Sequence, residues 1–93
     1  MIERDGNQLR ISGALTIANA AELCEAAKQH INGDVVVDLA AVTEVDSSAL
    51  SLLFEWRRAA QQSNSRISFR NLPDSLESLA ALYGVADLVA ADA

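Results

Sequence analysis

A short apolar strand that leads through a loop into a helix constrains the fold of this chain most. Val35, Val36, Val37 and Leu39 form an almost continuous apolar run, which is typical of a parallel strand covered on both faces. Two serines follow the loop, and their hydroxyl groups can cap a helix. The segment therefore predicts a buried strand, a loop and a helix that runs from Ser48 to about Gln62, with Ser47 or Ser48 as its cap.

The first third of the chain predicts a hairpin followed by a helix. Asp5-Gly6 is a turn signal between a short strand at residues 2–4 and a longer strand with alternating apolar positions. Asn19 followed by Glu22 resembles a capping box, and the stop signal Asn32-Gly33 predicts the end of the helix. The apolar positions on one face of that helix are Ala20, Leu23, Ala27 and Ile31.

The last third predicts one more strand and one more helix. Ile67 and Phe69 alternate with polar residues, as in a half-buried strand. Pro73 then turns the chain into a helix, Gly84 is placed to end that helix in a left-handed conformation, and residues 85–89 predict a final short helical piece. The expected inner face of the helix consists of Leu76, Leu79, Ala80 and Tyr83.

This alternation of strands and helices predicts the fold class. Short connections between the elements imply right-handed crossovers and a small sheet with its helices on one side. A chain of 93 residues makes one domain that buries somewhat more than half of its unfolded surface. We therefore expect a single α/β domain over residues 1–93, with a mixed sheet of four to five strands and about three to four helices packed mainly on one side.

Charge and hydropathy exclude several classes of function. The net charge of −6, from 7 basic and 13 acidic residues, argues against nucleic acid as a partner, because backbone binding needs clustered cations. No apolar run approaches the roughly 20 residues that cross a bilayer, so we expect no direct membrane insertion. The polar start and the single Cys24 are compatible with the cytoplasm.

Four of the seven basic residues nevertheless lie in one segment that contains no acid. They are Arg57, Arg58, Arg66 and Arg70, whereas the first 56 residues carry three cations and nine acids. This asymmetry could orient a protein partner. The alternative, a solvated helix end and strand edge, is the favoured interpretation.

Catalytic and metal-binding chemistry finds little support in the sequence. His30 has no neighbour that would make it part of a Cys-His or Ser-His pair. Asp38 and Asp46 could face one another across the loop with Glu44 nearby, but a divalent metal would need more ligands than these. The glycines form no phosphate-binding loop. We expect a protein that is not an enzyme and has no catalytic residue, cofactor or metal.

The central helix carries more apolar residues than one face can bury. Adjacent helical positions differ by about 100°, so Phe54 and Trp56 cannot both point the same way as Leu50 and Leu53. Some apolar surface near Ser47 is therefore expected to be exposed, as at an interaction site. The alternative is that neighbouring elements cover all of it.

The stretch from Asp38 to Leu50, D-L-x-x-V-x-x-V-D-S-S-A-L, resembles the central segment of STAS domains. This family includes anti-sigma-factor antagonists and the cytoplasmic regions of sulfate transporters. Its D-S-S or D-T-x triplet opens the second helix. Ala49 stands where the family usually has Gly, a departure that could alter how closely a partner approaches. The resemblance covers almost the whole chain and implies the STAS fold.

The segment from Leu72 to Val85, L-P-D-S-L-x-x-L-A-x-L-Y-G-V, resembles the STAS subunit of the lipid-asymmetry (Mla-type) phospholipid ABC transporter. This resemblance implies a non-catalytic cytoplasmic subunit, peripheral at the inner membrane, that binds and supports the ATPase in a complex with a permease. It implies partner contacts near the start of the second helix, from Asp46, Ser47, Ser48, Leu50, Ser51 and Phe54. Leu79 and Tyr83 are then either core residues or the edge of that docking surface.

The D-S-S triplet also fits an anti-sigma-factor antagonist, in which a serine kinase that is itself the anti-sigma factor phosphorylates Ser47. A phosphate adds a charge of about −1.5 to −2 at neutral pH, which a helix start tolerates but an acidic or apolar partner surface does not. Asp46 would then shape the loop beside the modified serine. A third class, a sensor of nucleotides or other small molecules, has no pocket specified by the sequence.

Overall fold

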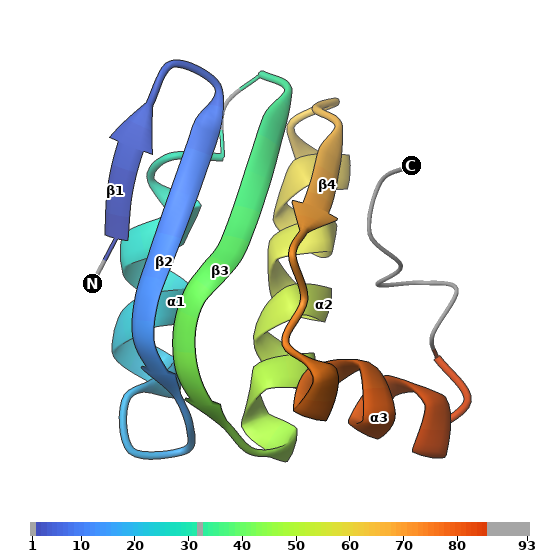
Figure 1. The fold of residues 1–93 in the computed structure, drawn as a ribbon. Helices are drawn as coiled ribbons and strands as arrows, with labels where there is room; N and C mark the ends of the chain where they lie inside the picture. The colour runs from blue at the N-terminus through green and yellow to red at the C-terminus, as the bar shows by residue number, and fades with distance from the viewer. Residues whose placement is uncertain (1, 32, 86–93) are drawn as a thin grey trace.

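The computed structural model describes residues 2–31 and 33–85 of the chain. Within these residues, four strands and three helices follow one another in the order that the sequence predicts (Figure 1). The strands are β1 (Ile2–Asp5), β2 (Gln8–Leu15), β3 (Val35–Val45) and β4 (Ile67–Arg70). The helices are α1 (Ala20–Lys28), α2 (Ser47–Gln62) and α3 (Asp74–Leu82).

The strands form one mixed sheet in the order β1-β2-β3-β4. The hairpin pair β1-β2 is antiparallel, whereas β3 is parallel to both β2 and β4. Figure 1 shows α1 and α2 side by side behind the sheet, with α3 at one end of α2 and β4. The prediction of a small α/β fold with a mixed sheet and helices on one side is confirmed.

The core lies between the sheet and the helices α1 and α2. Trp56 is its largest member, is fully buried, and donates a hydrogen bond from Nε1 to the main-chain oxygen of Cys24 at 3.4 Å. This bond joins α2 to α1 through the middle of the core. The other fully enclosed large side chains are aliphatic, namely Leu9, Ile11, Leu15, Leu39, Leu53, Leu76, Val35 and Val37.

The central strand differs from the prediction in two ways. The described part of the chain covers just one face of this strand. Val35, Val37 and Leu39 are buried, whereas Asp38 and Ala40, which point to the other face, are not. The strand also continues to Val45, so that the expected loop is mostly strand. Register shifts in its pairing with β2, typical of bulges, allow the two strands to stay paired over this length.

The ends of α1 also differ from the prediction. Asn19 makes no capping bond; its Oδ1 accepts from the Thr16 amide at 3.1 Å and its Nδ2 donates to the Ala14 oxygen at 2.7 Å. The side chain therefore closes the preceding loop and is not available to the helix. The helix ends at Lys28, before the predicted stop signal.

The turn after α3 agrees with the prediction, since Gly84 has a left-handed φ of 71°. Val85 packs against the core. The final helical piece expected at residues 85–89 lies, beyond Val85, outside the described residues.

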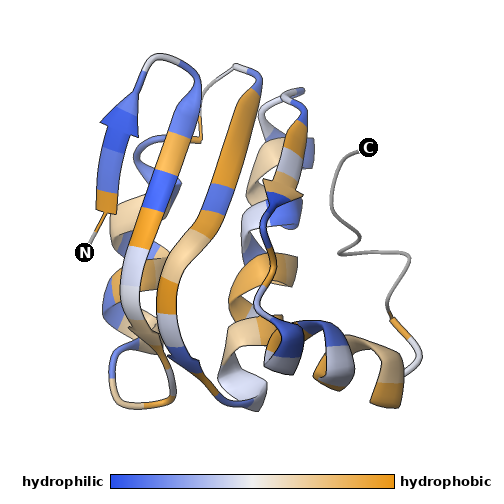
Figure 2. Ribbon diagram, viewed as in Figure 1, coloured by the Kyte–Doolittle hydropathy of each residue, from blue (hydrophilic) through white to orange (hydrophobic). Residues whose placement is uncertain are grey.

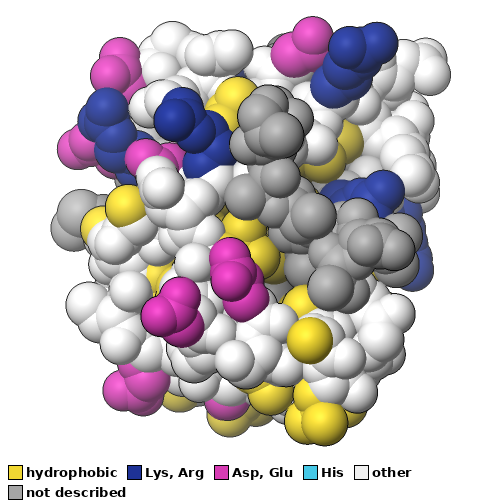
Figure 3. Space-filling view, turned by 45° about the vertical axis from the view of Figure 1, so that its right-hand side comes forward, with side chains coloured by type: hydrophobic (Ala, Val, Ile, Leu, Met, Phe, Trp, Pro, Cys, Tyr) yellow, Lys and Arg dark blue, Asp and Glu magenta, His cyan; other side chains and the backbone are white. Residues whose placement is uncertain are grey.

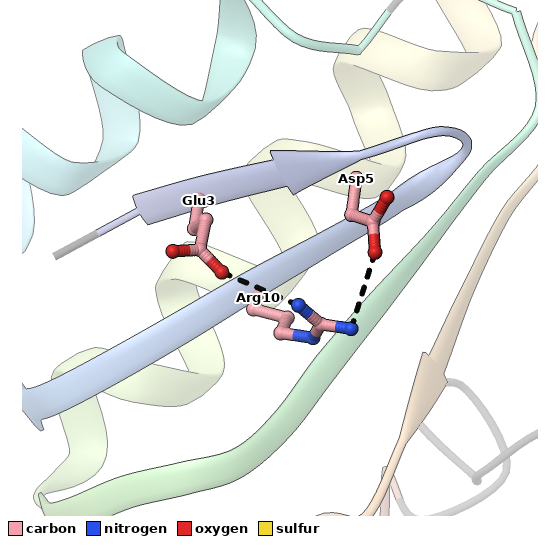
Figure 4. A network of polar contacts seen from close by, with 3 residues as sticks. All are labelled: Glu3, Asp5 and Arg10. Atoms are coloured by element: carbon pink, nitrogen blue, oxygen red, sulfur yellow. Dashed lines mark hydrogen bonds and ion pairs between the residues drawn. The ribbon is translucent and has the colours of Figure 1, made fainter.

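A row of alternating charge crosses the open face of the sheet. Glu3, Arg10, Asp38 and Arg70 are successive cross-strand partners from β1 to β4. Arg10 bonds Glu3 at 3.2 Å and Asp5 at 3.3 Å (Figure 4). Figure 2 shows the polar bands of β2 and β3 between apolar stretches of these strands, whereas β1 is hydrophilic over most of its length. Opposite charges are neighbours throughout this row, which favours one strand register.

Candidate partner-binding site

Asp46 organises the point at which β3 passes into α2. Its Oδ1 accepts from the Ser48 amide at 2.8 Å, and its Oδ2 accepts from the Ile17 amide at 3.0 Å. Asp46 is therefore the cap of α2, and the expectation that Ser47 or Ser48 caps the helix is wrong. The carboxylate succeeds there because its two oxygens satisfy two amides from separate segments.

These two amides also hold Asp46 in its charged form. The hydrogen bond from the Ile17 amide lowers the pKa of the Asp46 carboxyl below its usual value, and the bonds from Ser48 act in the same direction. The loop between β2 and α1 is thereby tied to the first turn of α2.

Because Asp46 provides the cap, the hydroxyl group of Ser47 is not required for that role. Ser47 is exposed as the first residue of α2, Ser51 is exposed one turn later, and Ser48 is partly covered. An exposed hydroxyl beside a helix N-terminus is accessible to a partner or to a modifying enzyme.

Two hollows adjoin Ser47. The first, of about 280 Å³, is lined by Ser47, Ser48, Leu50, Ser51, Phe54, Tyr83 and Val85. The second, of about 620 Å³, is lined by Val45, Asp46, Ser47, Ser75, Ser78, Leu79, Leu82 and Tyr83. Ser47 and Tyr83 line both hollows, and we call the combined area the Ser47 surface. Figure 3 shows hydrophobic side chains along the lower edge of the view, the end at which α3 lies in Figure 1.

The residues predicted to contact a partner all line this surface, but their side chains differ in how much they are exposed. Leu50 is only 4% exposed and forms part of the floor. Phe54 is partly buried against the core. The apolar area that α2 exposes is smaller than expected, because Leu53 and Trp56 are also buried and α3 packs against α2.

The large exposed apolar side chains of the described residues come from other elements. Of these the sequence analysis named Tyr83 alone, as either a core residue or the edge of the docking surface. Tyr83 is 59% exposed and Leu82 is 77% exposed, at the end of α3. The prediction that Tyr83 lies on the inner face of α3 is wrong, because the helix ends at Leu82 and Tyr83 begins the turn before Gly84. The helical spacing that placed it inside no longer applies there. Ile17, which is 78% exposed, lies in the loop that Asp46 holds.

The carboxylates considered for metal or acid-base chemistry do not meet. Asp38 accepts hydrogen bonds from Asn71 and from the Ala40 amide, both at 3.0 Å, whereas Asp46 bonds at the other end of β3. The Asn71 bond, followed by that from Ala40, lowers the pKa of Asp38. Within residues 2–31 and 33–85, no group of three His, Cys, Asp or Glu side chains is arranged to hold a metal ion.

Among the helices of the described segments, none is both long and apolar enough to cross a membrane.

Comparisons with known proteins agree with this architecture. A family model described as "Mlab, STAS domain" matches residues 1–90. The structure of the anti-sigma factor antagonist SpoIIAA in its unphosphorylated form aligns with a TM-score of 0.76 at 13% identity, covering 100% of this chain and 87% of that one. The phosphorylated form of SpoIIAA, a Bacillus cell fate determinant, aligns with a TM-score of 0.71 at 13% identity, covering 100% of this chain and 90% of that one.

Part of a larger protein has a similar fold. A crystal structure of Mglu aligns with a TM-score of 0.59 at 21% identity, and the match covers 80% of this chain but 20% of Mglu. No curated protein sequence matches the chain.

Proposed function

Because the chain belongs to the STAS domain family, we propose that it is a non-catalytic subunit that binds the ATPase of a phospholipid ABC transporter. In this role it supports the transport that maintains lipid asymmetry in the outer membrane. The description of the matching family model supports this assignment, as does the resemblance of residues 72–85 to the transporter subunit. The proposed location is cytoplasmic, at the inner membrane through the ATPase and its permease.

The Ser47 surface is the observation that carries this proposal. It joins exposed serine hydroxyls to the large exposed side chains of Leu82 and Tyr83. Tyrosine contributes strongly to many protein interfaces, because it buries a large ring and keeps a hydroxyl group for hydrogen bonding. A surface with this chemistry is better suited to binding a protein partner than to catalysis.

Tyr83→Ala tests the proposed ATPase contact. The tagged chain is purified from its native host, and the proteins that copurify are identified by mass spectrometry. We expect an ABC ATPase and permease with the wild type, and a loss of ATPase recovery of at least tenfold with Tyr83→Ala, because truncating a central interface aromatic commonly costs about 2 kcal/mol or more. Gln62→Ala, at the opposite end of α2, is the matched control and should keep full recovery.

If Tyr83→Ala recovers as much ATPase as Gln62→Ala and the wild type do, the ATPase contact lies elsewhere on the chain. Absence of any transporter protein from the wild-type sample would count against the proposed function itself.

An anti-sigma-factor antagonist is the second candidate. Its support is the exposure of Ser47 and the fold shared with SpoIIAA, which is known in both unphosphorylated and phosphorylated forms. A phosphate on Ser47 would add negative charge beside the Asp46 carboxylate and disfavour an acidic or apolar partner. Recovery of a serine kinase together with a phosphorylated Ser47 peptide would favour this candidate, and partner exchange unchanged by Ser47→Ala would count against it.

A further inference from the structure

A third hollow lies at the opposite end of α2 from Ser47 and has a different chemistry. Its volume is about 450 Å³. Arg57 and Gln61 line it from α2, Arg66 lines it from the position just before β4, and Ser68 lines it from β4. Apolar residues of β3 and α2, including Val35, form other parts of the wall. Two arginines therefore line a common space together with residues that carry neutral hydrogen-bond donors.

The charge around this hollow is predominantly positive. Residues 57–73 contain four of the seven cations of the chain and no acid. Arg58, which does not line the hollow, pairs with Glu55 at 3.5 Å. Arg66 makes no ion pair with any described residue. Among the described residues of the wall the one acid is Asp34, so the formal charge of this described lining is positive.

The main chain beside Arg66 is held in place before any ligand arrives. Asp34 Oδ1 accepts from the Arg66 amide at 3.1 Å, and the Arg66 oxygen accepts from the Val35 amide at 2.9 Å. Ser65 Oγ accepts from the Gly33 amide at 3.0 Å. These bonds join the start of β3 to the start of β4, so binding at the hollow need not order this segment.

We propose that this hollow binds an anion that carries a phosphate group, either free or as an ester. Arg57 and Arg66 donate to its oxygens, since the planar guanidinium group matches phosphate and can donate two hydrogen bonds at once. Gln61 and Ser68 provide further donors. This site is separate from the Ser47 surface, and its occupancy does not depend on the proposed ATPase contact.

The test is a titration of the full chain with pyrophosphate at low ionic strength, followed by NMR of the backbone amides. We expect shifts centred on residues 65–68. Arg66→Gln and Arg57→Gln should each weaken binding roughly tenfold or more, because each removes a charge-assisted hydrogen bond. Arg58→Gln is the matched control with the same change of net charge, and its affinity should equal that of the wild type.

Asp34→Asn provides a test in the opposite direction. The amide oxygen of asparagine can still accept from the Arg66 amide, while the negative charge of the wall is lost. We therefore expect tighter binding, which damage to the fold would not produce. Equal weakening by Arg58→Gln would reduce the effect to general electrostatic attraction. No tightening by Asp34→Asn would show that the anion does not bind beside this wall, and either result would overturn the proposal.

Two arms separate the sources of phosphate. Pyrophosphate reports binding of a free anion, and cosedimentation with phosphatidylglycerol vesicles, against phosphatidylcholine vesicles, reports a lipid headgroup. Binding that Arg66→Gln weakens in either arm supports the site, and binding in neither overturns it. Tyr83→Ala should leave anion binding intact and Arg66→Gln should leave ATPase recovery intact, so failure of this site and failure of the proposed function are distinguishable.

Discussion

At the scale of single residues, Asp46 has the greatest influence on the candidate site. One carboxylate caps α2 through Ser48 and holds the loop of Ile17. It thereby places an exposed apolar residue and an exposed serine in fixed positions relative to each other. Such a residue positions the surface, whether or not it contacts the partner itself.

The two bonds of Asp46 can be separated by substitution. Asp46→Asn keeps one acceptor oxygen but replaces the other with a donor, so it should keep the cap on Ser48 and lose the bond to Ile17. Asp46→Ala loses both. We expect the thermal midpoint to be highest for the wild type, lower for Asp46→Asn and lowest for Asp46→Ala. Amide hydrogen exchange should accelerate at Ile17 in both variants, and at Ser48 only in Asp46→Ala. Equal exchange at Ser48 in the two variants would contradict this assignment.

At the scale of elements, the charge row explains how an open sheet face avoids becoming a second apolar surface. Each strand contributes one charged residue to this row, and the neighbour of that residue across the ladder has the opposite sign. A slip of one residue in any strand would turn these charges toward the core. The row therefore supports the register of the same strands that carry the core residues.

A double-mutant cycle on Glu3 and Arg10 measures this contribution. Both side chains are largely exposed, so the coupling between Glu3→Ala and Arg10→Ala should be small, about 0.2–1 kcal/mol in the free energy of unfolding. It should decrease in high salt, because ions screen exposed pairs. Glu25→Ala in place of Glu3→Ala is the control and should show no coupling to Arg10. A coupling that persists in 1 M salt (~3 Å screening length) would contradict the electrostatic explanation.

At the scale of the whole molecule, the two carboxylates with lowered pKa connect stability to pH. Asp38 and Asp46 have an ordinary pKa of 3.8 and a lower one in the folded chain. Their stabilising contribution is therefore complete above the ordinary value and is lost as the pH falls below it toward the folded pKa values.

Urea denaturation between pH 7 and pH 3 tests this connection. We expect the free energy of unfolding to stay nearly constant down to about pH 5 and to decrease at lower pH. Asp38→Asn should start from a lower stability at pH 7 and show a shallower decrease in acid. An identical acid dependence in Asp38→Asn and the wild type would show that other carboxylates are responsible.

The local signals of the sequence predicted most of the elements, because hydrophobic periodicity and turn residues act over short distances. The hairpin at Gly6, the buried run from Val35 and the turn at Gly84 are all found where the pattern placed them. The errors concern competition between several groups for the same hydrogen-bond partner. Asn19 was predicted to cap α1, but Ala14 and Thr16 occupy its side chain.

The sequence by itself determined the α/β fold class, the family resemblance and the presence of Ser47 at a helix start, because each depends on residue type and spacing along the chain. Only the tertiary structure decided which surface surrounds Ser47. The packing of α3 against α2 brought Tyr83 beside the serines, and Asp46 brought in the loop of Ile17. Contacts between residues some thirty positions apart depend on how the elements pack, and no local pattern encodes that geometry.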